Sequence, residues 1–383
     1  MMPDIAHGFQ IHPSRESSTV TTEVLQDLAT ENERWRIGAT LQVPRQRLAY
    51  WRRASSEWRQ TSDFIVADPE TTRMERPYAD RGRGRRDYAY LSESDPIANP
   101  NRFVGDVLEA QEQAGATVFV SPWLRHGVTQ TDNELAATLQ FAEIASETVG
   151  DDVRLLMGVE ATQGVFANRE ARNSLVNELV EGPELPVYLR MYVTAPRSYT
   201  QYKEKGALEG LATVVRALEA NDRPVALPQS GLCGWLMCAF GARSFGAGIS
   251  ASMQRNSAPS GGGGGLPPLH WYFVPQLLGF AQAEEMEDVA EVDEFSACEC
   301  PYCDGELPGT GAAFDAEAAG KHFLWCCAAL GAELDPDDPA QAVVARVEAA
   351  SAFFAALNNA RVALDSRSQP HHLAVWENLL QQA

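Results

Sequence analysis

A regular alternation of short apolar runs and helical stretches is the feature that most constrains this chain. From Asp63 onward, runs rich in aliphatic and β-branched residues alternate with amphipathic stretches of roughly 15 to 25 residues. The runs occupy 63–69, 117–123, 154–162, 187–194, 224–230 and 244–250. A near-continuous apolar run indicates a strand buried on both faces, and strands joined by helices require a parallel sheet.

The even spacing of these units predicts an α/β fold of the closed (β/α)8 type, a TIM barrel. The two missing strands could come from the first 60 residues or from the segment after Ser250. No GxGxxG motif follows the first run, which argues against an open dinucleotide-binding sheet. We expect a helical or irregular segment over 1–62, the barrel over 63–285 and a zinc-binding helical module over 286–383 that packs on the barrel.

The charge balance limits the partners that this chain can have. The formal net charge is −21, which argues against broad nonspecific binding to nucleic acid, because such binding depends on Lys and Arg. Arginines nevertheless gather over 73–86. This loop is either a solvated surface or a local contact with RNA or DNA.

Nothing in the sequence predicts a membrane protein. The longest apolar stretch, 231–242, has 12 residues, whereas a membrane span needs roughly twenty. The N-terminus lacks the charged and apolar pattern of a secretory signal. We therefore expect a cytoplasmic location.

Three thiols at C-x-C-x-x-C spacing, Cys298, Cys300 and Cys303, indicate a structural zinc site. A tight turn brings positions i, i+2 and i+5 to one side, and structural Zn²⁺ takes four N or S ligands. The fourth ligand is either His322 or Cys326, one helical turn further on. The alternative is a group of reduced, buried thiols that hold no metal.

Polar residues at the ends of the predicted strands are the candidates for chemistry, because the active sites of such barrels lie at the carboxyl ends of the strands. Asp68 and Glu160 could form an acid/base pair that cleaves a glycosidic bond. Alternatively, Asp68 forms a turn before Pro69, and Glu160 makes a structural ion pair with Arg190. The expected substrate-binding residues are Glu70, Trp123, Arg190, Gln229 and Ser230. Trp123 is equally consistent with a core position.

A predicted barrel followed by C-x-C-x-x-C and a later histidine resembles the tRNA-guanine transglycosylase superfamily, which includes DNA-directed deazaguanine transglycosylases. The run 224–250 follows the pattern of that family's last two barrel strands. The resemblance implies that Asp68 keeps the base-recognition carboxylate and that Glu160 takes the place of a glutamine. Where the family has the aspartate that attacks the ribose, this chain has Gly246. Glycine offers no nucleophile, so the double displacement of the family cannot run unchanged.

Two functions of different classes are consistent with these residues. The first is a divergent transglycosylase-like protein that binds a guanine or 7-deazaguanine base, or a nucleoside, in nucleic-acid modification of the queuosine or archaeosine type. If it is an enzyme, its class is pentosyl transfer. The second is a non-catalytic accessory or scaffold subunit. The resemblance also implies a homo- or heterodimer, for which the apolar helix with Phe353, Phe354 and Leu357 is available unless it packs on its own chain.

Overall fold

The computed structural model describes ten segments of the chain. They are 8–12, 18–31, 36–42, 48–71, 96–128, 133–150, 153–194, 201–249, 256–257 and 270–382. The predicted arginine loop over 73–86 therefore lies outside the described residues.

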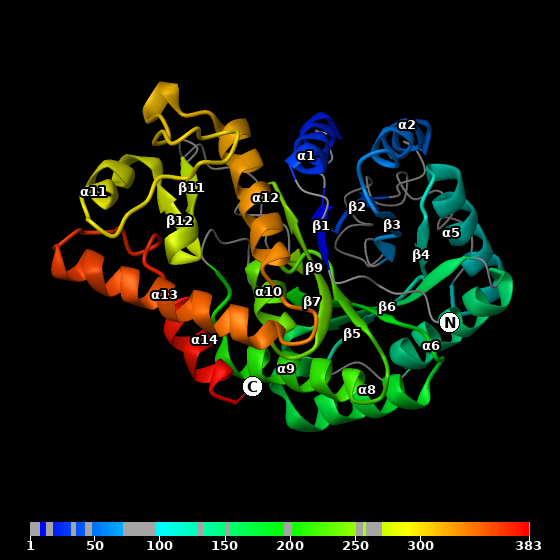
Figure 1. Cartoon of the computed structure of the whole chain (residues 1–383). Coiled ribbons are helices and arrows are strands. Elements are labelled where there is room, and N and C mark those ends of the chain that lie inside the picture. The colour runs from blue at the N-terminus through cyan, green and yellow to red at the C-terminus, as the bar shows by residue number, and fades with distance from the viewer. Residues whose placement is uncertain are drawn as a thin grey trace.

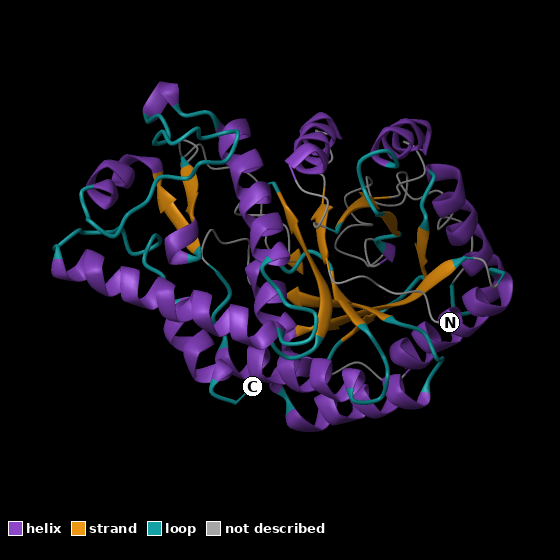
Figure 2. Cartoon of the chain, viewed as in Figure 1, coloured by secondary structure: helices purple, strands orange, loops and turns teal. Residues whose placement is uncertain are grey.

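Eight parallel strands among the described residues close into a TIM barrel, which confirms the predicted fold class (Figures 1 and 2). In barrel order they are β1 (Gly8–His12), β2 (Ile37–Gln42), β3 (Phe64–Asp68), β4 (Val118–Val120), β6 (Arg154–Thr162), β7 (Val187–Val193), β8 (Val225–Leu227) and β9 (Ala242–Gly248). The last strand closes the ring by pairing with the first, Phe245 opposite Phe9. Two short strands, β5 (Arg125–His126) and β10 (Asn256–Ser257), extend the sheet beside β6 and β7.

Helices cover the outside of the barrel. In chain order they are α1 (Ser18–Glu31), α2 (Leu48–Trp58), α5 (Pro100–Ala114), α6 (Asn133–Thr148), α7 (Gln163–Ala167), α8 (Arg169–Glu181), α9 (Lys205–Glu219), α10 (Leu232–Cys238) and α12 (Ala316–Ala332). Their ends follow from local chemistry. Gly115 ends α5 in the left-handed region at φ 84°, and Asp315 caps α12 by accepting from the backbone N–H groups of Glu317 and Ala318.

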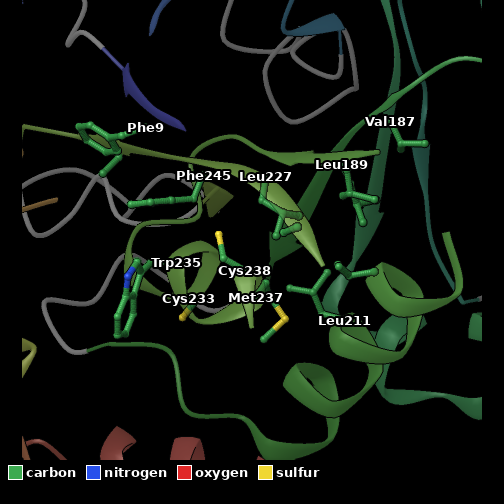
Figure 3. Packing of buried hydrophobic residues seen from close by; sticks show 14 of the residues in the cluster. Phe9, Val187, Leu189, Leu211, Leu227, Cys233, Trp235, Met237, Cys238 and Phe245 are labelled. Carbon is green, nitrogen blue, oxygen red and sulfur yellow. The ribbon is translucent and has the colours of Figure 1, made fainter. Parts of the chain in front are cut away.

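The main core lies between this helical layer and the strands. Figure 3 shows outward-facing Phe9, Phe245 and Leu227 packed towards Trp235 and Met237 of α10. All five are at most 1% exposed. Burial of each such side chain contributes about 1.5–3 kcal/mol to folding.

The N-terminal segment was assigned wrongly from the sequence. Residues 1–62 were assigned as a helical or irregular segment outside the barrel range 63–285, although the two missing strands could come from it; they contain β1 and β2, which pair with β9 and β3. Gln10, His12 and Thr40 interrupt the apolar pattern of these strands, and all three are buried. Polar residues inside the barrel therefore concealed the first two strands.

The expected boundary between barrel and module is also wrong. The module is an insertion between β9 and α12, and α12 lies against β1, β9, α1 and α10, so it is a helix of the barrel wall (Figure 1). The insertion contains an antiparallel hairpin, β11 (Trp271–Val274) and β12 (Gly279–Gln282), and α11 (Met286–Ala290). Short 3-10 turns lie at Pro275–Leu277, Ala283–Glu285 and Gly311–Ala313.

A second, smaller core joins this insertion to the C-terminal helices α13 (Pro339–Asn359) and α14 (His372–Leu380). Tyr272 and Val274 of the hairpin pack there with Phe353 and Leu357 of α13. Phe353 and Leu357 are buried within their own chain and Phe354 is half-buried. Among the described helices, α13 alone has the length and apolar composition to cross a membrane, which by itself is weak evidence of a span.

Candidate functional site

The interior of the barrel is apolar at depth and polar towards the carboxyl ends of the strands. Because side chains alternate along a strand, every second residue faces inward. A separate apolar cluster fills the deeper part, formed by Phe64, Val66, Val118, Val120, Trp123, Leu156, Tyr188 and Ala226. Further along the same faces come Asp68, two residues after Val66, Arg190, two residues after Tyr188, and Glu160, four residues after Leu156. Each is at most 3% exposed. The alternation therefore places a layer of buried charges above the apolar layer.

Asp68 ends β3 and its carboxylate accepts from three groups. Arg190 Nη1 donates to Oδ1 at 3.0 Å and to Oδ2 at 2.8 Å. The Tyr188 hydroxyl donates to Oδ2 at 3.1 Å, and the backbone N–H of Glu70 donates to Oδ1 at 2.8 Å. A carboxylate has about four acceptor sites, so these bonds occupy all of them. The hydrogen bond from the backbone N–H of Glu70 closes a turn around Pro69. A turn-forming role was the alternative that the sequence left open for Asp68.

Glu160 occupies the neighbouring strand pair, opposite Arg190 in the β6–β7 register. Arg125 Nε donates to its Oε1 at 2.5 Å and Asn256 Nδ2 to its Oε2 at 2.8 Å. Arg190 Nε lies 3.3 Å from Oε2. The structural ion pair between Glu160 and Arg190, one of the two expected roles, is thus present.

Arg190 and Arg125 pair with Asp68 and Glu160 in this layer. Burial raises the pKa of the Asp68 carboxyl, and the Arg190 guanidinium opposes that shift. Burial also disfavours the charged form of Arg190, but Asp68 and Glu160 outweigh it and raise the pKa of the guanidinium. Burial raises the pKa of the Tyr188 hydroxyl, which stays a donor. Removal of one partner from a buried ion pair of this kind strongly destabilises the folded protein, because it leaves a buried charge unpaired.

The other predicted binding residues lie close to this layer. Trp123 is fully buried in the apolar cluster. The centre of its ring lies 5.4 Å from the Arg190 guanidinium carbon. Gln229 accepts from Arg190 Nη2 at 2.9 Å. Ser230 donates to the carbonyl of Leu227 at 2.5 Å and is half-buried. The structure therefore gathers Trp123 and Gln229 around Arg190, whereas the Ser230 hydroxyl bonds to its own turn.

Backbone strain marks two of the strand ends. Glu70 has φ 44° and Gln229 has φ 47°, in the left-handed region that favours glycine. Such strain costs about 1–3 kcal/mol per residue and gathers at ligand clamps and active sites. Both residues touch the charged layer, Glu70 through Asp68 and Gln229 through Arg190.

Gly246, which the sequence resemblance aligns with a family nucleophile, faces inward on β9. A Cβ atom built there would lie 2.9 Å from both Cδ2 and Nε2 of His12. His12 ends β1, is 1% exposed and receives a hydrogen bond from the backbone N–H of Gln229 at 3.2 Å. The imidazole thus occupies the space that a side chain at 246 would need.

Sequence reasoning did not assign a role to His12, Tyr188 or Asn256. The i, i+2 alternation of Tyr188 and Arg190 was a usable signal, because both face the interior of the barrel. His12 had no such signal once its segment had been interpreted as irregular. Asn256 reaches Glu160 from a short strand that is far away in sequence.

The predicted metal ligands meet in the insertion. The ligand atoms of Cys298, Cys300, Cys303 and His322 all lie within 4.8 Å of one another. His322 is on α12, and its Nδ1 lies 3.4 Å from Cys300 Sγ and 3.3 Å from Cys303 Sγ. Zn–S bonds of about 2.3 Å and Zn–N bonds of about 2.0 Å in a tetrahedron separate such atoms by roughly 3.6 Å. The four residues therefore fit a tetrahedral metal ion.

Neighbouring groups orient the histidine. The Nε2–H group of His322 donates a hydrogen bond to the carbonyl of Phe273 at 2.8 Å. This bond leaves Nδ1 as the nitrogen that faces the thiols. The Tyr272 ring stacks on the imidazole with centroids 4.4 Å apart, and its hydroxyl lies 3.1 Å from Cys303 Sγ. Cys326, the rival ligand, lies 3.6 Å from Nδ1 but is outside the set of four.

The three thiols influence one another's ionisation. Hydrogen bonds from Cys300 and Cys303 lower the pKa of the Cys298 thiol, while the bond to Cys298 raises the pKa of the Cys303 thiol. One thiolate thus suppresses ionisation of its neighbour in the absence of a positive ion. Thiolate is the form that binds metal, so a bound cation would allow all three to ionise together.

Comparisons with known proteins give no family. No protein-family model matches this chain, and no curated protein matches it. One similar solved structure is a thiamine phosphate pyrophosphorylase from Pyrococcus furiosus, at 11% identity over 65% of this chain and 90% of that one, with a TM-score of 0.31. Another is (S)-3-O-geranylgeranylglyceryl phosphate synthase from Thermoplasma acidophilum, at 9% identity over 66% and 89%, with a TM-score of 0.35. Similarity at this level carries no argument about function.

Proposed function

We propose that this protein is a divergent relative of the tRNA-guanine transglycosylases. It binds a guanine- or 7-deazaguanine-type base, or a nucleoside, at the carboxyl end of its barrel, and it acts in nucleic-acid modification in the cytoplasm. The Cys298, Cys300, Cys303 and His322 cluster carries this proposal, because that motif beside a barrel is what the chain shares with the family. We assign the metal as structural Zn²⁺, since three thiolates and one imidazole leave no open position on a tetrahedral ion.

The polar layer supports binding of a base rather than the family's covalent chemistry. Gln229 and Trp123 lie beside Arg190 at the strand ends, where ligands of such barrels bind. Position 246 supplies no nucleophile, and the His12 ring fills the space beside it. Covalent glycosyl transfer through position 246 is therefore not part of the proposal.

Metal content tests the assignment of zinc. We expect mass spectrometry to find about one zinc per chain in protein purified without a polyhistidine tag. Cys300→Ser should lose the metal, because it removes one of four ligands. Cys327→Ala is the matched control, since Cys327 is equally buried but belongs to the apolar core. Absence of zinc from the wild type would remove the motif on which the family proposal depends.

Ligand-induced thermal stabilisation tests base binding. A ligand that binds only the folded state adds about 2.7 kcal/mol at 100 times its dissociation constant. We expect guanine and 7-deazaguanine to raise the melting temperature of the wild type and adenine to leave it unchanged. In Asp68→Asn we expect the shift to vanish relative to that variant's own melting temperature, because Asp68 fixes Arg190 and hence Gln229.

A non-catalytic scaffold is the second candidate, and one observation favours it. Every acceptor site of Asp68 is already taken, and Glu160 is paired with Arg125, so neither carboxylate is available without rearrangement. A wild type that holds zinc yet gains no stability from any base would favour this candidate. Charge reversal within 73–86 then tests nucleic acid as a partner, and the oligomeric state in solution tests dimerisation.

A further inference from the structure

The His12 imidazole has a buried N–H group that nothing in the described structure uses. The backbone N–H of Gln229 donates to Nε2, and the Thr40 hydroxyl lies 3.3 Å from the same atom. Nε2 is therefore an acceptor. Nδ1 is buried and has no hydrogen-bond partner among the described residues.

The protonation of the ring follows from its surroundings. Burial, with a smaller contribution from Arg190, lowers the pKa of His12 to about 3, so the imidazole is neutral at physiological pH. A neutral imidazole carries one proton. Since Nε2 accepts from the backbone, the proton lies on Nδ1, which makes Nδ1 an unsatisfied donor. A buried polar group without a partner destabilises the fold, so such a group in a native structure requires an explanation.

The position of His12 places its ring beside the candidate site. Gln10, two residues earlier on the same face of β1, bonds to Ser244 inside the barrel at 3.0 Å. His12 is the next inward residue and lies at the carboxyl end of β1. Gln229 connects it directly to Arg190. The indole N–H of Trp123, near Arg190, likewise has no acceptor among the described residues.

We propose that His12 is a ligand-binding residue whose Nδ1–H donates to the keto oxygen of the bound base. This inference rests on the proposed function and adds a specificity determinant to it. Guanine presents a keto oxygen and a ring nitrogen as acceptors on one edge. Its 7-deaza analogue lacks that nitrogen, so the keto oxygen is the acceptor that both bases share there.

Two conservative substitutions separate ligand binding from structural support. In His12→Asn the amide nitrogen can take the place of Nδ1 and keep the donor to the ligand. In His12→Gln the longer amide reaches the place of Nε2 and keeps the acceptor for Gln229. A purely structural ring would tolerate Gln better than Asn, whereas a ligand-binding ring would tolerate Asn better than Gln.

The experiment is a titration of guanine, 7-deazaguanine and 2,6-diaminopurine by isothermal calorimetry against wild type and both variants, with melting measured first without ligand. We expect His12→Gln to weaken binding of the two keto bases by roughly 2- to 12-fold, the range for one hydrogen bond. His12→Asn should bind them more tightly than His12→Gln. Binding of 2,6-diaminopurine, which has an amino group in place of the keto oxygen, should not distinguish the variants.

The outcomes separate the two claims. Keto bases that bind the wild type and His12→Gln equally, or that bind His12→Asn no better than His12→Gln, would overturn the role of His12 and leave the proposed function standing. A wild type that binds none of the bases would overturn both. If one variant fails to fold, His12→Ala with the same ligands replaces it, and undiminished binding to the keto bases would overturn the inference.

Discussion

At the scale of single residues, the contact between Gly246 and the His12 ring determines what position 246 can hold. Real Cβ atoms essentially never approach other heavy atoms within 3.0 Å, and a Cβ at 246 would lie 2.9 Å from two atoms of the ring. The imidazole is fixed by its bond from Gln229, so it cannot move away freely. Restoring a side chain there therefore disturbs the site.

Gly246→Ala should lower the free energy of unfolding by about 1–3 kcal/mol, the usual cost of overpacking a core. Gly246→Asp should cost more, because it also buries a charge without a dedicated partner. The measurement is urea denaturation. Gly105→Ala on α5 is the control, since its Cβ would meet nothing within 4 Å and helix propensity favours alanine. Equal stability of Gly246→Ala and wild type would show that the His12 ring moves aside without cost.

Two buried histidines make stability depend on pH. Burial lowers the pKa of His12 and of His372 to about 3 from an ordinary value of 6.5. Between these values each of the two histidines binds more protons in the unfolded chain than in the native one. These two groups therefore cost no stability above about pH 6.5 and destabilise the fold increasingly as pH drops towards 3. Each histidine contributes a slope of up to about 1.4 kcal/mol per pH unit.

His372→Gln isolates one of these contributions. The difference in unfolding free energy between wild type and variant should change with pH between about 6.5 and 3, because only the wild type must keep that imidazole neutral. Denaturant titrations at several pH values across this window give the difference. A difference that stays constant would mean that His372 does not titrate on unfolding.

At the scale of elements, the β11–β12 hairpin contacts the candidate metal cluster through Tyr272 and through the carbonyl of Phe273. Tyr272 holds Cys303 by a hydrogen bond and His322 by stacking. Outer contacts of this kind typically change metal affinity by about 10- to 100-fold. The hairpin is therefore part of the metal site as well as of the second core.

Tyr272→Phe should weaken metal binding within that range, because it removes the hydroxyl and keeps the stacked ring. Competition with a chromophoric chelator measures the affinity. Tyr302→Phe is a matched control, since the Tyr302 hydroxyl donates to Asp27 at 2.6 Å and to no thiol. Loss of affinity in both variants, or in neither, would contradict this role.

Helix α12 links the parts at the scale of the whole molecule. It carries His322 of the metal cluster, and it also packs on β1 and β9 of the barrel. The second core joins the same insertion to α13. No linker separates the candidate metal cluster from the barrel wall, so we expect a change at the cluster to affect both.

Removal of the metal by a chelator should lower the melting temperature of the whole chain in one transition. Calorimetry gives the number of transitions, and hydrogen exchange gives the location of the loosened amides. We expect faster exchange in α12 and β11 together with β1. Two separate transitions, with the barrel melting unchanged, would show that the insertion unfolds independently.

The sequence by itself determined the fold class, six of the eight strands and three of the four residues in the candidate metal cluster, with the fourth left open between His322 and Cys326. Continuous apolar runs and close thiol spacing are local patterns, so residues near in sequence suffice to define them. The tertiary structure alone revealed β1 and β2, the barrel role of α12 and the pairing of Asp68 with Arg190. These depend on which residues from distant strands face each other inside a closed barrel. A polar residue usually indicates an exposed position, but inside this barrel His12 is polar and buried.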